Sequence, residues 1–218
     1  MTKLIVALDL PSVSEALKVV HFLRDLDVIY KIGPYLLLDK ELQTLINKLQ
    51  GYKLMWDTKL NDIPSTMKAG VTAAANRSIL LMTLGAGIEQ EQAKAAISGQ
   101  RDGLPKLLMV VALTSTSSHL RGTILKKAVA ALTWGLNGVI VTGLGAIAIR
   151  KTCGPNFIIA CPGIREIGIS QDDQRLVVTP RKAVKNGADY IIIGRQIVNS
   201  LDVRATTEGI LFKMAEVS

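Results

Sequence analysis

Residues 52–77 read YKLMWDTKLNDIPSTMKAGVTAAANR, and this stretch contains the unit from which we expect the whole fold to be built. A short apolar run over 52–59 is typical of a buried strand, although it ends in the charges of Asp57 and Lys59. The residues over 63–77 are rich in alanine and other helix formers. A buried strand followed at once by a helix is one βα unit of an α/β protein.

The same unit recurs along the whole chain of 218 residues. Near-continuous runs of Ile, Val and Leu are typical of parallel strands covered on both faces. The expected strands cover residues 4–10, 28–33, 52–59, 78–84, 106–114, 138–143, 157–163 and 190–197. The expected helices cover residues 12–26, 35–50, 63–77, 89–98, 119–134, 144–152, 179–187 and 202–217. Eight βα units predict a closed (β/α)8 TIM barrel, a single domain over 1–218, with an open doubly wound sheet as the alternative.

Composition narrows the class of protein. Apolar residues make up 49% of the chain and charged residues 20%, which is enough for one continuous core. The formal charge of +8 suits an anionic partner such as a phosphorylated metabolite. Aromatic residues are only 4%, which offers little stacking surface for single-stranded nucleic acid, so no nucleic-acid partner is expected. No apolar run reaches the roughly 18 residues of a membrane span, so no membrane association is expected either.

The two cysteines indicate a compartment. Cys153 and Cys161 have neither CxxC nor Cys/His metal spacing, and a chain of this size needs no disulfide to be stable. We expect both to be reduced thiols in a cytoplasmic protein.

Polar and charged side chains gather where the expected strands end, which in a TIM barrel is the edge that carries the active site. These residues are Asp9, Lys31 with Gly33, Asp57, Lys59, Thr114, Pro162 with Gly163, and Gly194 with Arg195. Asp57 and Lys59 are two apart on one strand, so both should point into the barrel mouth, about 6.5–7 Å apart along the backbone. Lys31 can join them from the neighbouring strand. Such an array keeps each group ionised and places a cationic proton donor beside a fixed anion. The alternative interpretation of these charges is a surface salt bridge at the end of a strand.

A phosphate site is expected at the last two strands, where barrels often bind phosphate. Gly194 permits close backbone approach, and the guanidinium of Arg195 can bind phosphate through two hydrogen bonds. Residues 164–178 form a long polar connection of the kind that often binds ligands, and its Arg165 and Gln174 can close over the same phosphate.

Other chemically active side chains are expected to have structural roles. His21 and His119 lie in expected helices, away from the strand ends. Met55 and Trp56 precede Asp57 and are expected to pack between the barrel and its helices. Because no cluster of carboxylates and histidines has metal-ligand spacing, no metal and no other cofactor is expected.

Several motifs resemble one family. Asp57, Lys59 and Asp62, followed by Ile63-Pro64, form a DxKxxD pattern that resembles the signature of the orotidine 5'-phosphate decarboxylases. Five further motifs of the family match in chain order, two before this pattern and three after it. They are ALD at 7–9, YKIG at 30–33, CPGIR at 161–165, DQRLVVTP at 173–180 and GADYIIIGRQI at 187–197. Together they span almost 190 residues, which makes the resemblance specific. The chain departs from the family at 82–84, where MTL stands in place of a usual histidine.

The resemblance implies cofactor-independent decarboxylation of orotidine 5'-phosphate (OMP) to uridine 5'-phosphate (UMP), the last step of de novo pyrimidine biosynthesis, by a homodimer. Lys59 would protonate C6 of the pyrimidine as carbon dioxide leaves, beside Asp57 and Lys31, and Asp62 would reach into the partner subunit's site. The implied substrate-binding residues are Asp9 and Lys31 at the ribose, Ile63 and Thr66 across the interface, Ser117 (or Thr114), Pro162 and Gly163 at the pyrimidine, and Arg165, Gln174, Gly194 and Arg195 at the 5'-phosphate.

Two other functions remain open. A magnesium-dependent sugar-phosphate decarboxylase or hexulose-phosphate synthase on the same barrel would place a carboxylate on the second strand, where this chain has Lys31. A cation at this place would repel magnesium. The second alternative is a non-catalytic protein that binds nucleotide phosphates in the same pocket.

Overall fold

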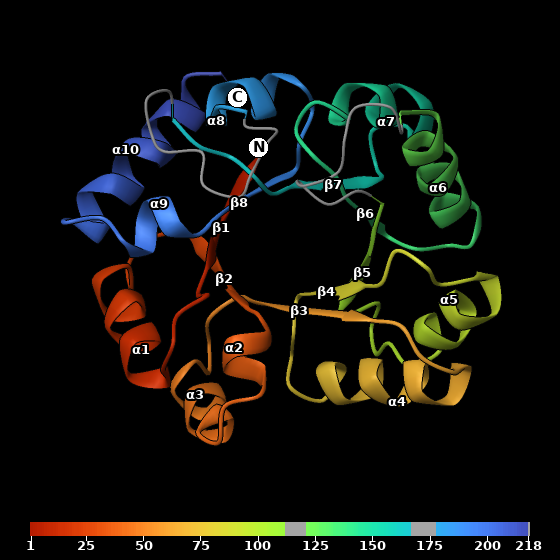
Figure 1. Ribbon diagram of the computed structural model, residues 1–218, viewed down its shortest axis with the longest axis horizontal. Coiled ribbons are helices and arrows are strands. Elements are labelled where there is room, and N and C mark those ends of the chain that lie inside the picture. The colour runs from red at the N-terminus through yellow and green to blue at the C-terminus, as the bar shows by residue number, and fades with distance from the viewer. Residues whose placement is uncertain (112–120, 167–177, 218) are drawn as a thin grey trace.

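Eight parallel strands close into a barrel in the computed structural model of the chain, which describes residues 1–111, 121–166 and 178–217 (Figure 1). The strands pair in chain order, and the last closes the ring on the first. They are β1 (Lys3–Ala7), β2 (Val28–Ile32), β3 (Leu54–Leu60), β4 (Leu81–Leu84), β5 (Lys106–Val110), β6 (Gly138–Ile140), β7 (Ile158–Cys161) and β8 (Tyr190–Ile193). The predicted TIM barrel is confirmed, and the open sheet is excluded.

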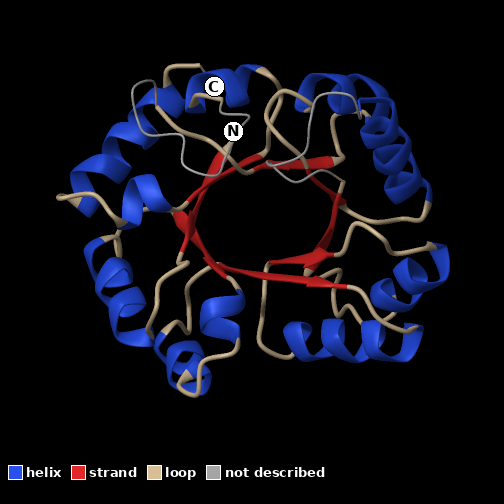
Figure 2. Cartoon of the chain, viewed as in Figure 1, coloured by secondary structure: helices blue, strands red, loops and turns tan. Residues whose placement is uncertain are grey.

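Helices surround the barrel on its outside, as Figure 2 shows. They are α1 (Val13–Phe22), α2 (Pro34–Leu37), α3 (Leu42–Lys48), α4 (Pro64–Ala75), α5 (Gln90–Ile97), α6 (Arg121–Thr133), α7 (Ala146–Cys153), α8 (Pro180–Lys185), α9 (Arg195–Val198) and α10 (Val203–Ala215). None of the helices in the described ranges is long and apolar enough to span a bilayer.

Several predicted strands are longer than the observed ones, and two predicted elements differ in more than the position of their ends. The helix expected over 35–50 is interrupted, because Asp39 Oδ1 accepts a hydrogen bond from the backbone N–H of Glu41 at 2.7 Å and forms a turn between α2 and α3. The strand expected over 190–197 ends at Ile193, and its last residues belong to α9. Both differences lie in the connections that follow β2 and β8.

Side-chain alternation along the strands divides the core into two layers. One layer fills the barrel interior and consists of Ile5, Ala7, Ile29, Met55, Leu81, Leu108, Val110, Ile140, Ala160 and Ile192. The other packs between strands and helices and includes Trp56, whose ring centroid lies 5.8 Å from the guanidinium of Arg77. The expectation that Met55 packs outside the barrel was wrong. A residue two positions before Asp57 points to the same side of the strand as Asp57, into the barrel.

Candidate functional site

A cavity of about 540 Å³ opens at the C-terminal ends of the strands. This volume is typical of small-molecule sites. Nine of the site residues predicted from the sequence line it: Asp9, Lys31, Asp57, Lys59, Pro162, Gly163, Arg165, Gly194 and Arg195. Its floor is apolar and belongs to the barrel interior, with Ala7, Met55, Val110, Ile140 and Ile192. An apolar floor with a charged rim suits a small molecule that has both a ring and an anionic group.

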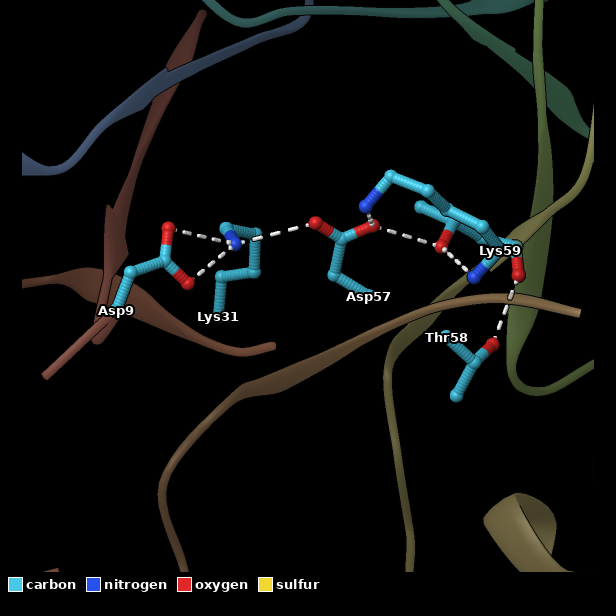
Figure 3. A network of polar contacts seen from close by, with 6 residues as sticks. Asp9, Lys31, Asp57, Thr58 and Lys59 are labelled. Atoms are coloured by element: carbon cyan, nitrogen blue, oxygen red, sulfur yellow. Dashed lines mark hydrogen bonds and ion pairs between the residues drawn. The ribbon is translucent and has the colours of Figure 1, made fainter. Parts of the chain in front are cut away.

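Four charged side chains from the first three βα units form a row along one rim (Figure 3). Lys31 Nζ lies 2.9 and 3.1 Å from the two carboxylate oxygens of Asp9, and 3.1 Å from Asp57 Oδ2. Lys59 Nζ lies 2.9 Å from Asp57 Oδ1. The signs alternate from Asp9 to Lys59, so every charge has an opposite neighbour. The structure thus brings together Lys31, Asp57 and Lys59, which the sequence placed in one array, and adds Asp9 to them.

Burial makes this pairing necessary for the two central members of the row. The side chains of Lys31 and Asp57 are 7% and 14% exposed. Burial by itself would lower the pKa of Lys31, but the charges of Asp57 and Asp9 outweigh it and raise this pKa above its ordinary value. Burial would raise the pKa of Asp57, but Lys31 and then Lys59 bring it below its ordinary value. Both groups are therefore charged at neutral pH.

We expect the Asp57 carboxyl group to titrate below 3.8, its ordinary value, when its ¹³C chemical shift is followed against pH by NMR. Lys31→Met should move the midpoint upward, because Lys31 then no longer opposes the effect of burial. Since the folded-state pKa is below the unfolded one, the pairing stabilises the fold fully above the unfolded-state pKa. This contribution is lost as the pH falls through the folded-state pKa.

The control for this titration is Lys48→Met, which removes an exposed lysine of α3 and should leave the Asp57 midpoint where it is. An unmoved midpoint in Lys31→Met would contradict the electrostatic coupling between β2 and β3.

The strand that carries Asp57 and Lys59 is irregular. Between Trp56 and Leu60, β3 advances four residues while its partner β4 advances two, so β3 bulges. Lys59 has φ of 46°, in the left-handed region that residues with a Cβ rarely adopt. The sequence predicted a regular strand with both side chains on one face. Lys59 reaches Asp57 instead from a β-bulge, a feature that re-aims side chains next to active sites.

Thr83 of β4 contacts both ends of this bulge. Its hydroxyl accepts a hydrogen bond from the backbone N–H of Lys59 and donates one to Asp57 Oδ1, both at 2.9 Å. The Thr58 hydroxyl donates to the backbone carbonyl of Thr83, also at 2.9 Å. Thr83 is 1% exposed and was missed from the sequence. The signal that could have found it is alternation, because Leu81, two positions earlier, faces the barrel interior.

The space between the carboxylates of Asp9 and Asp57 is filled by the ammonium group of Lys31. Gly33 is needed beside it, since a Cβ at this position would lie 2.7 Å from Asp9 Oδ1 and 3.2 Å from Lys31 Nζ. Within the described ranges, no three His, Cys, Asp or Glu side chains form a group that could hold a metal ion. A further residue missed from the sequence, Tyr35 of α2, lines the cavity near this point.

Arginines lie at the rim formed after β7 and β8. Arg165 is 5% exposed and Arg195 is exposed, and both line the cavity. Gly163, which also lines it, has φ of 73°, a conformation that glycine adopts readily. The connection after β7 is closed at its base by a parallel bridge between Ile164 and Val178. This rim has the guanidinium groups that suit a phosphate.

Three predicted residues do not line the cavity of their own chain: Asp62, Ile63 and Thr66. All three are exposed, Ile63 at 64%. Asp62 Oδ1 accepts a hydrogen bond from the backbone N–H of Ile63 at 2.7 Å, and Gln92 of α5 donates to the backbone carbonyl of Asp62 at 2.7 Å. Other predicted residues lie outside the described ranges, namely Thr114, Ser117, His119 and Gln174.

Comparisons with known proteins agree on one family. Residues 2–210 match the family model described as "Orotidine 5'-phosphate decarboxylase / HUMPS family". The orotidine 5'-phosphate decarboxylase of Nitratidesulfovibrio vulgaris (strain DP4) is 32% identical over 234 residues, covering 100% of this chain and 99% of that protein. That of Methylobacterium sp. (strain 4-46) is 35% identical over 230 residues, covering 98% and 96%. The crystal structure of the enzyme from Lactobacillus acidophilus is similar with a TM-score of 0.84 and 31% identity, covering 98% of this chain and 99% of that one.

Proposed function

The chain belongs to the orotidine 5'-phosphate decarboxylase / HUMPS family, and on this premise we propose that it is a carboxy-lyase that converts OMP to UMP and carbon dioxide in pyrimidine biosynthesis. The observation that carries the proposal is the alternating row from Asp9 to Lys59 at the rim of the cavity. The arginines that line the same cavity suit the phosphate of this substrate.

The chemical difficulty of the reaction lies at C6 of the pyrimidine. When the bond between C6 and the carboxylate breaks, its electron pair stays on C6 as carbon dioxide leaves, and the ring has no electron sink for this pair. An ammonium group fixed next to C6 stabilises the developing charge and then donates a proton to form the new C6–H bond. Lys59 has this role in our proposal, and its amine regains the proton from water.

The other charged residues hold Lys59 ready for this step. Asp57 binds the ammonium group of Lys59 at 2.9 Å. In this proposal Asp57 also lies beside the substrate carboxylate, and the repulsion between these two anions ends when carbon dioxide leaves. Lys31 fixes the second oxygen of Asp57 and, together with Asp9, binds the ribose hydroxyls. Since contacts within the protein already pair each charge of the row, the row does not have to be assembled at the moment of reaction.

Binding energy comes from the parts of the substrate that do not react. In this proposal the phosphate is bound by Arg165, Gln174, Gly194 and Arg195, and the pyrimidine by Ser117 (or Thr114), Pro162 and Gly163. Interactions far from C6 can contribute to the desolvation and orientation that the reaction requires.

We further propose that the chain acts as one domain in a cytoplasmic homodimer with shared active sites. Asp62, with Ile63 and Thr66 beside it, would complete the site of the partner subunit. One observation supports this arrangement: Asp62 is exposed and does not line the cavity of its own chain.

The proposal is tested by a spectrophotometric assay of OMP consumption on protein treated exhaustively with a chelator. We expect full activity without metal and no gain on adding magnesium, because Lys31 fills the space between the carboxylates of Asp9 and Asp57. Strict dependence on magnesium, with turnover of a sugar phosphate in place of OMP, would favour the metal-dependent enzymes on this barrel. Binding of UMP without any turnover of OMP would favour a non-catalytic binding protein.

A further inference from the structure

We propose that Thr83 is a positioning residue for this decarboxylation: its hydroxyl holds Lys59 in the bulge of β3 and fixes the Asp57 carboxylate against the Lys59 ammonium group. The inference rests on the proposed decarboxylase function. Thr83 does not line the cavity, so it would act through Asp57 and Lys59 and not by touching the substrate.

Chemistry decides the direction of both hydrogen bonds of Thr83. The backbone N–H of Lys59 can only donate, so Thr83 Oγ1 accepts from it. The ionised carboxylate of Asp57 can only accept, so the Thr83 hydroxyl donates to it. The oxygen that it contacts, Oδ1, is the one that binds Lys59 Nζ, while Oδ2 binds Lys31. One hydroxyl therefore links the backbone of the proton donor to the carboxylate that orients its side chain.

The backbone of Lys59 needs a support of this kind. A φ of 46° is unfavourable for a residue with a Cβ, and such conformations persist where the surroundings hold them. Thr83 can provide the support because it is buried and β-branched, and because β4 pairs with β5 in register at Thr83 and Leu108. A rigid strand thus holds a strained residue at the site of proton transfer.

The test compares variants at Thr83 in the OMP assay, with UMP binding measured by calorimetry. Thr83→Val removes the hydroxyl at nearly constant volume, and we expect kcat per binding-competent site to fall about 10- to 100-fold. The KM for OMP and the affinity for UMP should stay near the wild-type values, because Arg165 and Arg195 are unchanged. Thr83→Ser keeps the hydroxyl and should restore kcat to near wild type.

Thr58→Val is the matched control. The Thr58 hydroxyl donates to the carbonyl of Thr83 within the same bulge, and among the described residues it has no hydrogen bond to a charged side chain, so its loss should leave kcat near wild type. The stoichiometry of UMP binding counts the folded sites, so a loss of stability alone does not lower kcat per site. If Thr83→Val does not fold, Thr83→Ala provides the same comparison.

Three results would overturn the proposal: wild-type kcat in the variant without a hydroxyl, a Thr83→Ser variant as slow as Thr83→Val, or an equal loss in Thr58→Val. A wild-type protein that binds UMP but consumes no OMP would refute the proposed function itself, which is a different outcome.

Discussion

Lys59→Ala should lower kcat for OMP decarboxylation by about 10⁴-fold or more, because proton transfer and the stabilisation of charge at C6 are lost together. The KM for OMP should change far less, since Arg165 and Arg195 bind the phosphate at another part of the rim in our proposal. The measurement is the initial rate at saturating OMP, with UMP binding to show that the sites are intact.

Two lysine variants separate the role of Lys59 from the effect of its charge. Lys59→Arg keeps a positive charge but spreads it over a guanidinium group that does not release a proton, so it should also be slow. Lys48→Met removes an exposed lysine of α3 and should have the kcat of the wild type. If Lys59→Ala kept about a tenth of the wild-type activity, Lys59 could not be the group that both donates the proton and stabilises the charge at C6.

The sequence predicted the eight strands because parallel strands covered on both faces need long apolar runs, and such runs are visible without knowing what packs on them. It predicted the charged row for a similar reason. Asp9 follows β1, Lys31 lies one residue before the end of β2, and Asp57 lies in the half of β3 that leads to the same edge of the barrel. The break between α2 and α3 was missed because a single hydrogen bond of Asp39 ends one helix within a pattern that otherwise suits a continuous one.

The detailed geometry of the site depends on relations between strands that apolar runs do not reveal. The bulge at Lys59 is a shift of β3 against β4, and such a shift appears only when the two strands are paired. Alternation places Thr83 on the inner face of β4, but its hydrogen bonds with Asp57 and Lys59 depend on how β4 pairs with the bulge. The place of Met55, in contrast, follows from alternation alone and could have been predicted.

Mixing two inactive variants, Lys59→Ala and Asp62→Ala, should restore activity, because Asp62 serves the partner's site in our proposal. In a hybrid dimer, one site combines native Lys59 of one chain with native Asp62 of the other, and the second site lacks both. After random exchange of subunits about half of the dimers are hybrids with one intact site, so about a quarter of the wild-type activity should return. If Asp62 acted in its own chain, no site in any dimer would be intact.

Asp62 also accepts a hydrogen bond from the backbone N–H of Ile63, so its replacement by alanine removes a local contact together with the charge. Asp62→Asn keeps an acceptor for this N–H and loses only the charge. Mixing it with Lys59→Ala should therefore restore as much activity as mixing Asp62→Ala with Lys59→Ala. The double variant Lys59→Ala/Asp62→Ala, mixed with Asp62→Ala, has no native Asp62 in any dimer and should restore nothing. Hybrid dimers that form, as native mass spectrometry can show, but stay inactive would mean that Asp62 does not complete the partner's site. The exposed carboxylate of Asp62, between β3 and α4, would then have a role other than catalysis in the partner's site.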